Sequence, residues 1–380
     1  MINTDRLTER FIRLAETDSP SRQERAVAEI LEAELKALGA DVSFDDAHKE
    51  CQSETGNLLA RIPGTVDVPP MLLSGHMDTV VPGEGIKVVF EEGVFRSAGE
   101  TVLGGDDKSA LAIIMEVMQT LIENDIPRPP VEIVFTVCEE IGLLGAKNFD
   151  TGTLKATMGY ILDSKDTEAV VTNAPFAVNY KITVHGVSAH AGMEPEKGVN
   201  AISVASDAIT RISCGRIDEE TTCNLGKIEG GSATNIVPDC VEITGEARSH
   251  SKAKLETILD GIRNAFQEAV VHAGGGDDET LPRYEIKVDE DFPGTSVPHD
   301  HAVVTLAQEA GKELGRTIAT QYVGGGSDAN VFFGKGITAG VLGTGMTDVH
   351  TTNESITLAD MTASAELLIT ILSKHAAQGA

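Results

Sequence analysis

In the first part of the chain, short apolar runs alternate with longer segments of helical periodicity. Residues 71–73, 131–137 and 158–162 are nearly continuous apolar runs, the type expected for strands buried on both faces of a sheet. Between the first two runs, residues 107–123 carry an apolar stripe at helical spacing. The stretch 21–24, Ser-Arg-Gln-Glu, has the spacing of a capping box ahead of another amphipathic helix. Strand, helix and strand in this order predict a largely parallel sheet flanked by helices.

From Phe176 the pattern changes to one typical of an antiparallel sheet. Strands and helices are predicted in the order β-α-β-β-α-β, which is a ferredoxin-like α+β unit. After Pro293 the earlier alternation resumes. We therefore predict an α/β catalytic domain formed by residues 1–175 and 293–380, with an inserted domain at 176–292. The predicted strands of the insertion are 178–185, 222–229, 241–249 and 283–289, its helices are 199–213 and 252–272, and the later elements are 302–314, 338–342 and 358–373.

Length and charge limit the classes of function. At 380 residues the chain exceeds the size of about 250 to 300 residues at which one core stops growing, so two domains are expected. The 59 acidic and 30 basic residues give a formal charge of −29, which opposes binding to nucleic acid or to anionic lipid. We expect neither as a partner.

Cysteine usage and hydropathy predict a cytoplasmic protein. The five cysteines are odd in number, scattered, and without a Cys-x-x-Cys pair, as expected for free thiols in a reducing compartment. The chain has neither a signal-peptide pattern at its start nor a run of about 18 apolar residues.

Candidate metal ligands follow several of the predicted strands. His76 and Asp78 come directly after the first apolar run, so His76 can ligate an ion while Asp78 holds the other ring nitrogen. Because the carboxyl ends of parallel strands form the binding edge of such a sheet, we expect the polar residues there to converge. A mixed set of histidines and carboxylates favours zinc, with manganese or cobalt as alternatives. The remaining candidates are Asp106, Asp107, Glu139, Glu140, Asp163 and His350.

Each of these residues taken alone has a structural interpretation. One of the adjacent Asp106 and Asp107 is expected to cap the helix at 107–123, which leaves the other to bridge two cations. Glu139 and Glu140 are neighbours at a strand end and point in different directions. One can therefore bind metal while the other acts as general base.

As an ordered set, these motifs resemble the dinuclear zinc peptidase family that includes peptidase T, glutamate carboxypeptidase, succinyl-diaminopimelate desuccinylase and the aminoacylases. The resemblance spans nearly the whole chain and is greatest to the peptidase T-like members. The motifs are Ser74-Gly-His76-Met-Asp78-Thr, Gly104-Gly-Asp106-Asp-Lys108, Glu139-Glu140-x-Gly142, Asp163, Ser188-Ala-His190-Ala-Gly192 and His350-x-x-x-Glu354.

The resemblance implies roles for these residues. Asp106 is expected to bridge two Zn²⁺ ions, with His76 and Asp163 completing one ion and Glu140 and His350 the other. Asp78 would orient His76. Glu139 would be the general base that takes a proton from water to give a metal-bridging hydroxide, so hydrolysis would proceed without a covalent intermediate.

The resemblance also implies that the insertion is a lid and dimerisation domain, so we expect a homodimer. His190 is expected to stabilise the oxyanion, often from the other subunit of a dimer. The expected substrate contacts are Asn235, Arg248, Gly325 and Ser327.

Two substrate classes remain open. One is short peptides, from which a tripeptidase-like aminopeptidase releases the N-terminal residue. The other is N-acyl amino acids, the substrates of a carboxypeptidase-type deacylase. Ser164 and Lys165 stand where peptidase T has glycines, and the region between Met77 and Ala98 is shorter, which leaves tripeptide preference open. A non-catalytic, metal-dependent peptide-binding protein is a third interpretation, which the intact Glu139 argues against.

Overall fold

The computed structural model describes residues 2–276 and 280–379, which form two compact units. One unit comprises Met1–Asn173, Thr295–Val323 and Ser327–Ala380, and is called the catalytic unit below. The other, the inserted unit, comprises Ala174–Gly294 and Gly324–Gly326. The boundaries predicted at 175/176 and 292/293 lie within two residues of these, whereas the assignment of Gly324–Gly326 to the inserted unit was not predicted.

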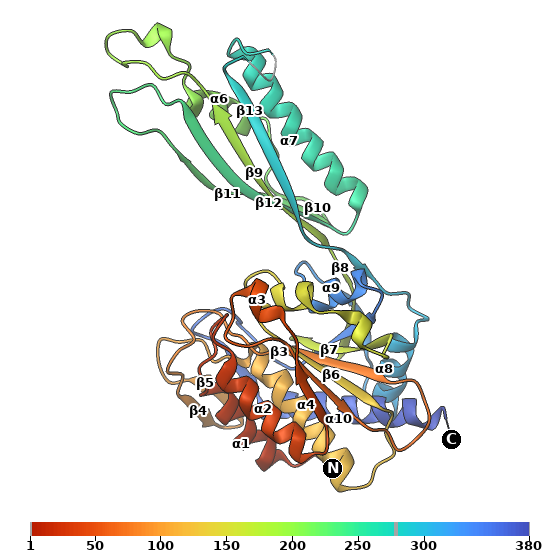
Figure 1. Cartoon of the computed structure of the whole chain (residues 1–380). Coiled ribbons are helices and arrows are strands. Elements are labelled where there is room, and N and C mark those ends of the chain that lie inside the picture. The colour runs from red at the N-terminus through yellow and green to blue at the C-terminus, as the bar shows by residue number, and fades with distance from the viewer. Residues whose placement is uncertain (1, 277–279, 380) are drawn as a thin grey trace. The chain divides into compact units, whose positions relative to one another are not determined.

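The catalytic unit is built on a mixed sheet with helices on both sides (Figure 1). Its centre is parallel: β6 pairs with β3, β3 with β7, and β7 with β16. β2 and β8 join this centre antiparallel. The strand order is β1 (Asp41–Phe44), β2 (Leu58–Ile62), β6 (Val131–Thr136), β3 (Met71–His76), β7 (Met158–Ser164), β16 (Thr338–Gly343), β8 (Ala169–Ala174) and β14 (Thr295–Ser296), with β15 (Ala319–Tyr322) on β8.

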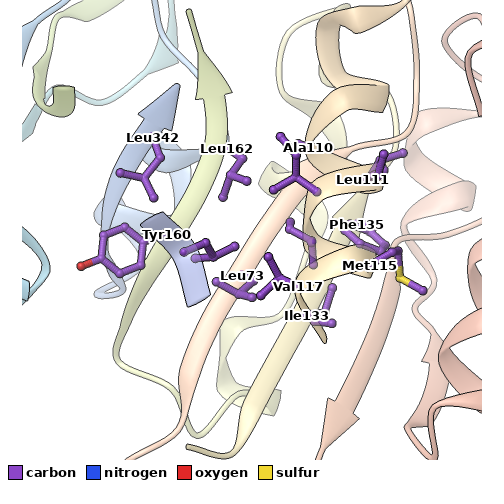
Figure 2. Packing of buried hydrophobic residues seen from close by; sticks show 14 of the residues in the cluster. Leu73, Ala110, Leu111, Met115, Val117, Ile133, Phe135, Tyr160, Leu162 and Leu342 are labelled. Atoms are coloured by element: carbon purple, nitrogen blue, oxygen red, sulfur yellow. The ribbon is translucent and has the colours of Figure 1, made fainter. Parts of the chain in front are cut away.

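The predicted, largely parallel sheet with flanking helices is confirmed, and the packing of its core explains the apolar runs in the sequence. Leu73 and Ile133 point to one face, where they belong to the buried cluster that also includes Val117 and Leu111 of α4 (Figure 2). Leu72 and Val134 point to the other face and are also fully buried. Strands buried on both sides read as continuous apolar runs. The helices are α1 (Thr4–Ala15), α2 (Arg25–Ala37), α3 (Ala47–Cys51), α4 (Gly105–Glu123), α5 (Leu144–Asn148), α8 (Ala302–Glu313), α9 (Asp328–Gly334) and α10 (Leu358–Ala377), with a 3-10 turn at Thr151–Thr153.

A small antiparallel sheet accompanies the large one. It consists of β4 (Val88–Glu91), β5 (Val94–Ser97) and β17 (Ser355–Thr357). β17 pairs with β5 and leads directly into α10. Across the described residues, none of the helices combines the length and apolar character needed to cross a membrane.

The inserted unit is an antiparallel sheet with two helices packed on one side (Figure 1). The four predicted strands and two helices are present, in the predicted order. One further strand, β10, was not predicted. The elements are β9 (Phe176–His185), a 3-10 turn (Pro195–Lys197), α6 (Ala201–Ile209), β10 (Gly215–Asp218), β11 (Thr221–Gly230), β12 (Cys240–Ser249), α7 (Lys252–His272) and β13 (Arg283–Phe292).

Alternation along β9 separates the two faces of the inserted sheet. Ile182 and Val184 are fully buried in a core shared with α6 and α7, whereas Asn179 and Lys181 are exposed. The sheet order β10-β11-β12-β9-β13 places the first predicted strand in the interior, as a ferredoxin-like fold requires.

The predicted capping box at 21–24 is wrong. Helix α2 begins at Arg25 after Glu24, and neither side chain of the pair caps it. The Ser21 hydroxyl instead donates to Asp78 at 2.7 Å, and the Glu24 carboxylate accepts from the backbone N–H of Cys138 at 3.0 Å. Both side chains are used for contacts far along the chain, so the local spacing was misleading.

Candidate metal centre

Neighbouring parallel strands of the catalytic unit deliver the predicted ligands to one edge of the sheet. His76 is the last residue of β3, Asp163 lies at the end of β7, and Glu140 follows β6. His350 lies in the connection after β16. These strands are adjacent in the order β6-β3-β7-β16, which places their carboxyl ends side by side.

His76 is held between two aspartates. Its Nε2 lies 3.1 Å from Asp106 Oδ1, and its Nδ1 lies 3.0 Å from the carbonyl oxygen of Asp78 and 3.4 Å from Asp78 Oδ1. Burial lowers the pKa of His76, but the hydrogen bonds with Asp106 and Asp78 outweigh it and raise the pKa. β3 ends at His76, so Asp78 reaches the ring from the segment that follows the strand.

Asp106 sits where the other ligands meet. His350 Nε2 lies 3.2 Å from Asp106 Oδ2 and 3.1 Å from Glu140 Oε1. Ligand atoms of His76, Asp106 and Glu140 lie within 4.8 Å of one another, as do those of Asp106, Asp107 and Asp163. Asp106 is therefore common to both groups, which is the position that a bridging ligand needs.

Neither aspartate caps the following helix, contrary to the prediction. The N-cap position of α4 is Gly104, which has no side chain to cap the helix, and Asp106 and Asp107 have non-helical backbone angles. Asp107 Oδ2 instead accepts from the backbone N–H of His76 at 3.2 Å. The Glu354 carboxylate accepts hydrogen bonds from backbone N–H groups of this loop.

A buried lysine fastens the same loop to the N-terminal helix. Lys108 is fully buried, and its Nζ donates to the carbonyl oxygens of Leu14 and Thr17, each at 3.2 Å. Burial lowers the pKa of Lys108 to about 8, against the pull of carboxylates that include Asp78.

The two adjacent glutamates occupy a turn that is held by its backbone. Asp78 Oδ1 accepts from the N–H of Glu139 at 2.9 Å, and Asp78 Oδ2 accepts from the N–H of Glu140 at 3.2 Å. Cys138, just before them, has a left-handed backbone with φ of 53° and donates its N–H to Glu24. Glu139 and His350 are both outside the two ligand groups, but His350 contacts Asp106 and Glu140, which belong to them. This separation fits the predicted division between ligand and base.

Clustered buried carboxylates make the site suited to cations. Burial is the main cause that raises the pKa of Glu139, Glu140 and Asp163. Asp107 Oδ1 is buried and has no hydrogen-bond partner in the described part of the chain. Several acids gathered in this way are costly unless a positive charge is present. Imidazole and carboxylate donors suit zinc, manganese and cobalt, so the residues present fit divalent metal.

One further acid lies near the base. Asp328 is buried, and its Oδ2 accepts from Thr136 Oγ1 at 2.5 Å at the end of β6. Burial raises the pKa of Asp328 to about 6. Its other oxygen, Oδ1, has no hydrogen-bond partner among the described residues.

In the inserted unit, His190 and Asn235 lie close together. His190 forms a β-bridge with Ile236, and the N–H of Ala191 donates to the Asn235 carbonyl at 3.0 Å. The N–H groups of Gly192 and Met193 both donate to His190 Nδ1 at 3.2 Å. In neutral His190 these bonds assign the proton to Nε2, which leaves the exposed ring with a free N–H donor.

Arg248 lies at the opposite end of the inserted sheet from His190. Its guanidinium donates to Glu246 at 2.9 Å and to the Gly324 carbonyl at 3.4 Å, and stands 5.8 Å from the centre of the Phe292 ring. Gly325 follows Gly324 in the same unit and has open space around it.

Ser327 has a structural task in the catalytic unit. Its hydroxyl accepts from the N–H of Ala329, and Asn330 completes the capping box of α9. The structure therefore gives a cap for Ser327, while its predicted substrate contact stays a prediction.

Sequence reasoning missed the residues that fix the backbone of the ligand-bearing segments through hydrogen bonds. Glu24 was assigned to a cap, and Glu354 was seen only as part of a motif. Glu354 has no charged neighbour in the sequence, and a buried glutamate of that kind needs N–H partners, which was the available signal. Glu24 stands beside Arg25 and gave no such signal.

Comparison with known proteins identifies the family. The model of peptidase family M20/M25/M40 matches residues 72–374. The chain belongs to this family. It is 39% identical to aminopeptidase PepT of Bacillus cereus ATCC 10987 over 99% of both chains, with a TM-score of 0.91. A tripeptidase of Staphylococcus aureus subsp. aureus Mu50 is 38% identical over 100% of both chains, with a TM-score of 0.93. Peptidase T of Geobacillus kaustophilus (strain HTA426) is 26% identical over 96% of this chain and 97% of its own.

Membership confirms the predicted resemblance to peptidase T-like proteins. The chain is a hydrolase of the peptidase class, with a PepT-like fold over its whole length. Candidate metal-ligating residues gather at the carboxyl edge of its main sheet.

Proposed function

We propose that this protein is a dizinc aminopeptidase that releases the N-terminal residue of short peptides, with tripeptides as the first substrate class to test. The observation that carries this proposal is the convergence of His76, Glu140 and His350 on Asp106. The likeness to a PepT aminopeptidase and to a tripeptidase, over the full length of each chain, supports the substrate class.

We propose that two sets of residues, which share Asp106, would hold two cations. These sets differ from the two ligand groups described above, where His76 is grouped with Glu140. We assign His76 and Asp163 to one ion and Glu140 and His350 to the other, with Asp106 shared. When bound, such ions supply Lewis acidity toward the scissile carbonyl and lower the pKa of water. Zn²⁺ is the proposed metal, and Mn²⁺ or Co²⁺ would suit the same donors.

Glu139 is the residue that we assign to proton transfer. Its side chain lies outside both ligand groups, and its turn is fixed by the bond from its N–H to Asp78. Burial raises its pKa, which makes the carboxylate a better proton acceptor than an exposed glutamate. Glu139 would take a proton from the attacking water and deliver it to the leaving amine.

His190 is proposed to donate its Nε2–H to the oxyanion. The hydrogen bonds at Nδ1 fix this tautomer without any substrate present. His190 lies at the end of the inserted sheet away from Phe176 and Phe292, where the chain enters and leaves the unit. This placement supports a homodimer in which the inserted unit of one copy serves the metal centre of another.

Asn235, Arg248 and Gly325 are proposed as substrate contacts on the inserted unit. The Arg248 cation suits a peptide carboxylate. We propose a cytoplasmic location, which the five unpaired cysteines support.

A substrate panel tests the proposal. Zinc-loaded protein is assayed against tripeptides with free and with acetylated N-termini, and against N-acetyl and N-succinyl amino acids, with Glu139→Gln as the inactive control. Hydrolysis restricted to tripeptides with a free amino group is the expected result. Turnover of the N-acyl amino acids alone would replace the aminopeptidase with a deacylase, and cation binding without turnover of any compound would contradict both.

A further inference from the structure

Glu354 joins two segments that carry ligands of the proposed metal centre. Its Oε2 accepts from the backbone N–H groups of Leu103 at 2.8 Å and Gly104 at 2.9 Å. Its Oε1 accepts from the N–H of Asp106 at 2.9 Å. The carboxylate is 2% exposed, so water cannot replace these bonds. Burial raises the pKa of Glu354, and the three N–H donors act against that rise.

The turn before Glu354 presents His350. The turn is closed at its base by two backbone bonds between Thr347 and Ser355, at 2.9 and 3.1 Å. His350 itself has a left-handed backbone with φ of 63°, and its side chain is 51% exposed. An exposed side chain on a strained turn gains little restraint from packing. Glu354 therefore anchors this turn to the loop that carries Asp106.

A carboxylate can make all three bonds without a donor of its own that competes with them. Both of its oxygens act as acceptors, and together they face three N–H donors. A glutamine of the same shape would turn its NH₂ group toward Asp106 or toward the pair Leu103 and Gly104. Either orientation sets donor against donor and leaves a buried N–H unsatisfied.

Gly105 shows how closely the carboxylate lies against the loop. A Cβ atom added at Gly105 would be 3.0 Å from Glu354 Oε1, so the carboxylate would have to move by a few tenths of an ångström. The backbone of Gly105 does not itself require glycine, since its φ is not positive. The absent side chain thus leaves room for the carboxylate.

We propose that Glu354 is a positioning residue that sets the distance between Asp106 and His350 and thereby the affinity of the centre for divalent cations. It touches neither substrate nor the reacting atoms. The inference rests on the proposed metal centre. It adds a residue without which the ligands are present but not held at the distances that bind a cation tightly. Residues that orient metal ligands from behind commonly change cation affinity by about 10- to 100-fold when replaced.

Zn²⁺ binding to the metal-free full-length protein tests this inference. The affinity is measured by competition with a chromophoric chelator for wild type and for Glu354→Gln, and the coordination geometry is read from Co²⁺ absorption. We expect Glu354→Gln to bind Zn²⁺ about 10- to 100-fold more weakly and to change the Co²⁺ spectrum.

Glu132→Gln is the matched control. Glu132 is 3% exposed and also accepts two backbone N–H bonds, from Lys155 at 2.8 Å and Ala156 at 2.7 Å, but it lies near the start of β6, away from the ligands. Its replacement should lower the midpoint of thermal unfolding and leave Zn²⁺ affinity unchanged. Equal Zn²⁺ affinity in wild type and Glu354→Gln would overturn the inference, as would an equal loss in Glu354→Gln and Glu132→Gln.

Gly105→Ala keeps the test decisive if Glu354→Gln does not fold. It leaves Glu354 in place and displaces its carboxylate, so a several-fold loss of Zn²⁺ affinity is expected. Gly99→Ala is its control, because nothing lies within 4 Å of the added atom there. Wild-type affinity in folded Gly105→Ala would overturn the inference. Failure of wild type to bind any divalent cation would instead overturn the proposed metal centre and this inference with it.

Discussion

The two sheets of this protein use their polar residues in opposite ways. In the catalytic unit the parallel strands are buried on both faces, and the ligands at their ends are restrained by one another and by buried partners such as Asp78. In the inserted unit one face of the antiparallel sheet is solvated, and His190 and Asn235 are exposed on loops. The candidate metal site of the first sheet is therefore defined by residues of a single chain. The second sheet presents exposed groups, and we propose a substrate or another copy of the chain as their partner.

Removal of metal should have the largest effect on activity, and it should change the structure of the catalytic unit only. Chelation is expected to abolish hydrolysis reversibly. It should also raise amide exchange at 103–106 and 348–354, because the carboxylates then repel one another, while exchange in β9 to β13 stays the same. Hydrogen exchange with and without Zn²⁺ measures this. Equal changes in both units would contradict the separation.

Glu139→Gln should reduce turnover next most strongly. The loss expected on removing a general base is about 100- to 10,000-fold, with Zn²⁺ affinity close to that of wild type because Glu139 is outside the ligand groups. Single-turnover kinetics and a zinc titration on the same sample check it. Near-normal turnover in the metal-loaded variant would remove Glu139 from its role.

His190→Ala tests the exposed side of the comparison. We expect a loss in turnover of about 100-fold, the scale for one oxyanion donor, with unchanged folding and Zn²⁺ affinity. Mixing His190→Ala with Glu139→Gln should restore part of the activity if one copy supplies the histidine to another. A mixed dimer with no recovered activity would favour supply within one chain.

Ile182→Ala should have the smallest effect on the chemistry. The side chain is fully buried in the core of the inserted unit, so its truncation should cost about 2 to 5 kcal/mol of stability there. Zn²⁺ affinity should stay at the wild-type value. The matched change Ile133→Ala, in the core under the ligands, should lower both thermal stability and Zn²⁺ affinity. A fall in Zn²⁺ affinity with Ile182→Ala would show that the two units are coupled.

Sequence patterns predicted the elements well where local spacing decides the structure. The apolar runs at 71–73 and 131–137 became β3 and β6, and the alternation after Phe176 became β9. Short strands such as β10 lack enough residues for a pattern, and this one was missed.

Long-range hydrogen bonds explain the errors at the site. Ser21 and Glu24 have capping-box spacing, but their partners Asp78 and Cys138 lie 57 and 114 residues away. Asp106 and Asp107 precede a helix, but Glu354, 248 residues from Asp106, satisfies the loop instead. Which residue types can bind a cation is visible in the sequence. The side chains that fix the ligands in place do so through long-range contacts, and local spacing in the sequence does not predict these.

The buried ammonium of Lys108 has a practical consequence for the choice of expression boundaries. Its hydrogen bonds end on Leu14 and Thr17, at the close of the first helix. A recombinant chain started after Thr17 would keep all the proposed ligands and lose both acceptors. Such a truncation would leave the buried Lys108 ammonium without these two hydrogen bonds, and a loss of activity in it would report on folding rather than on the ligands.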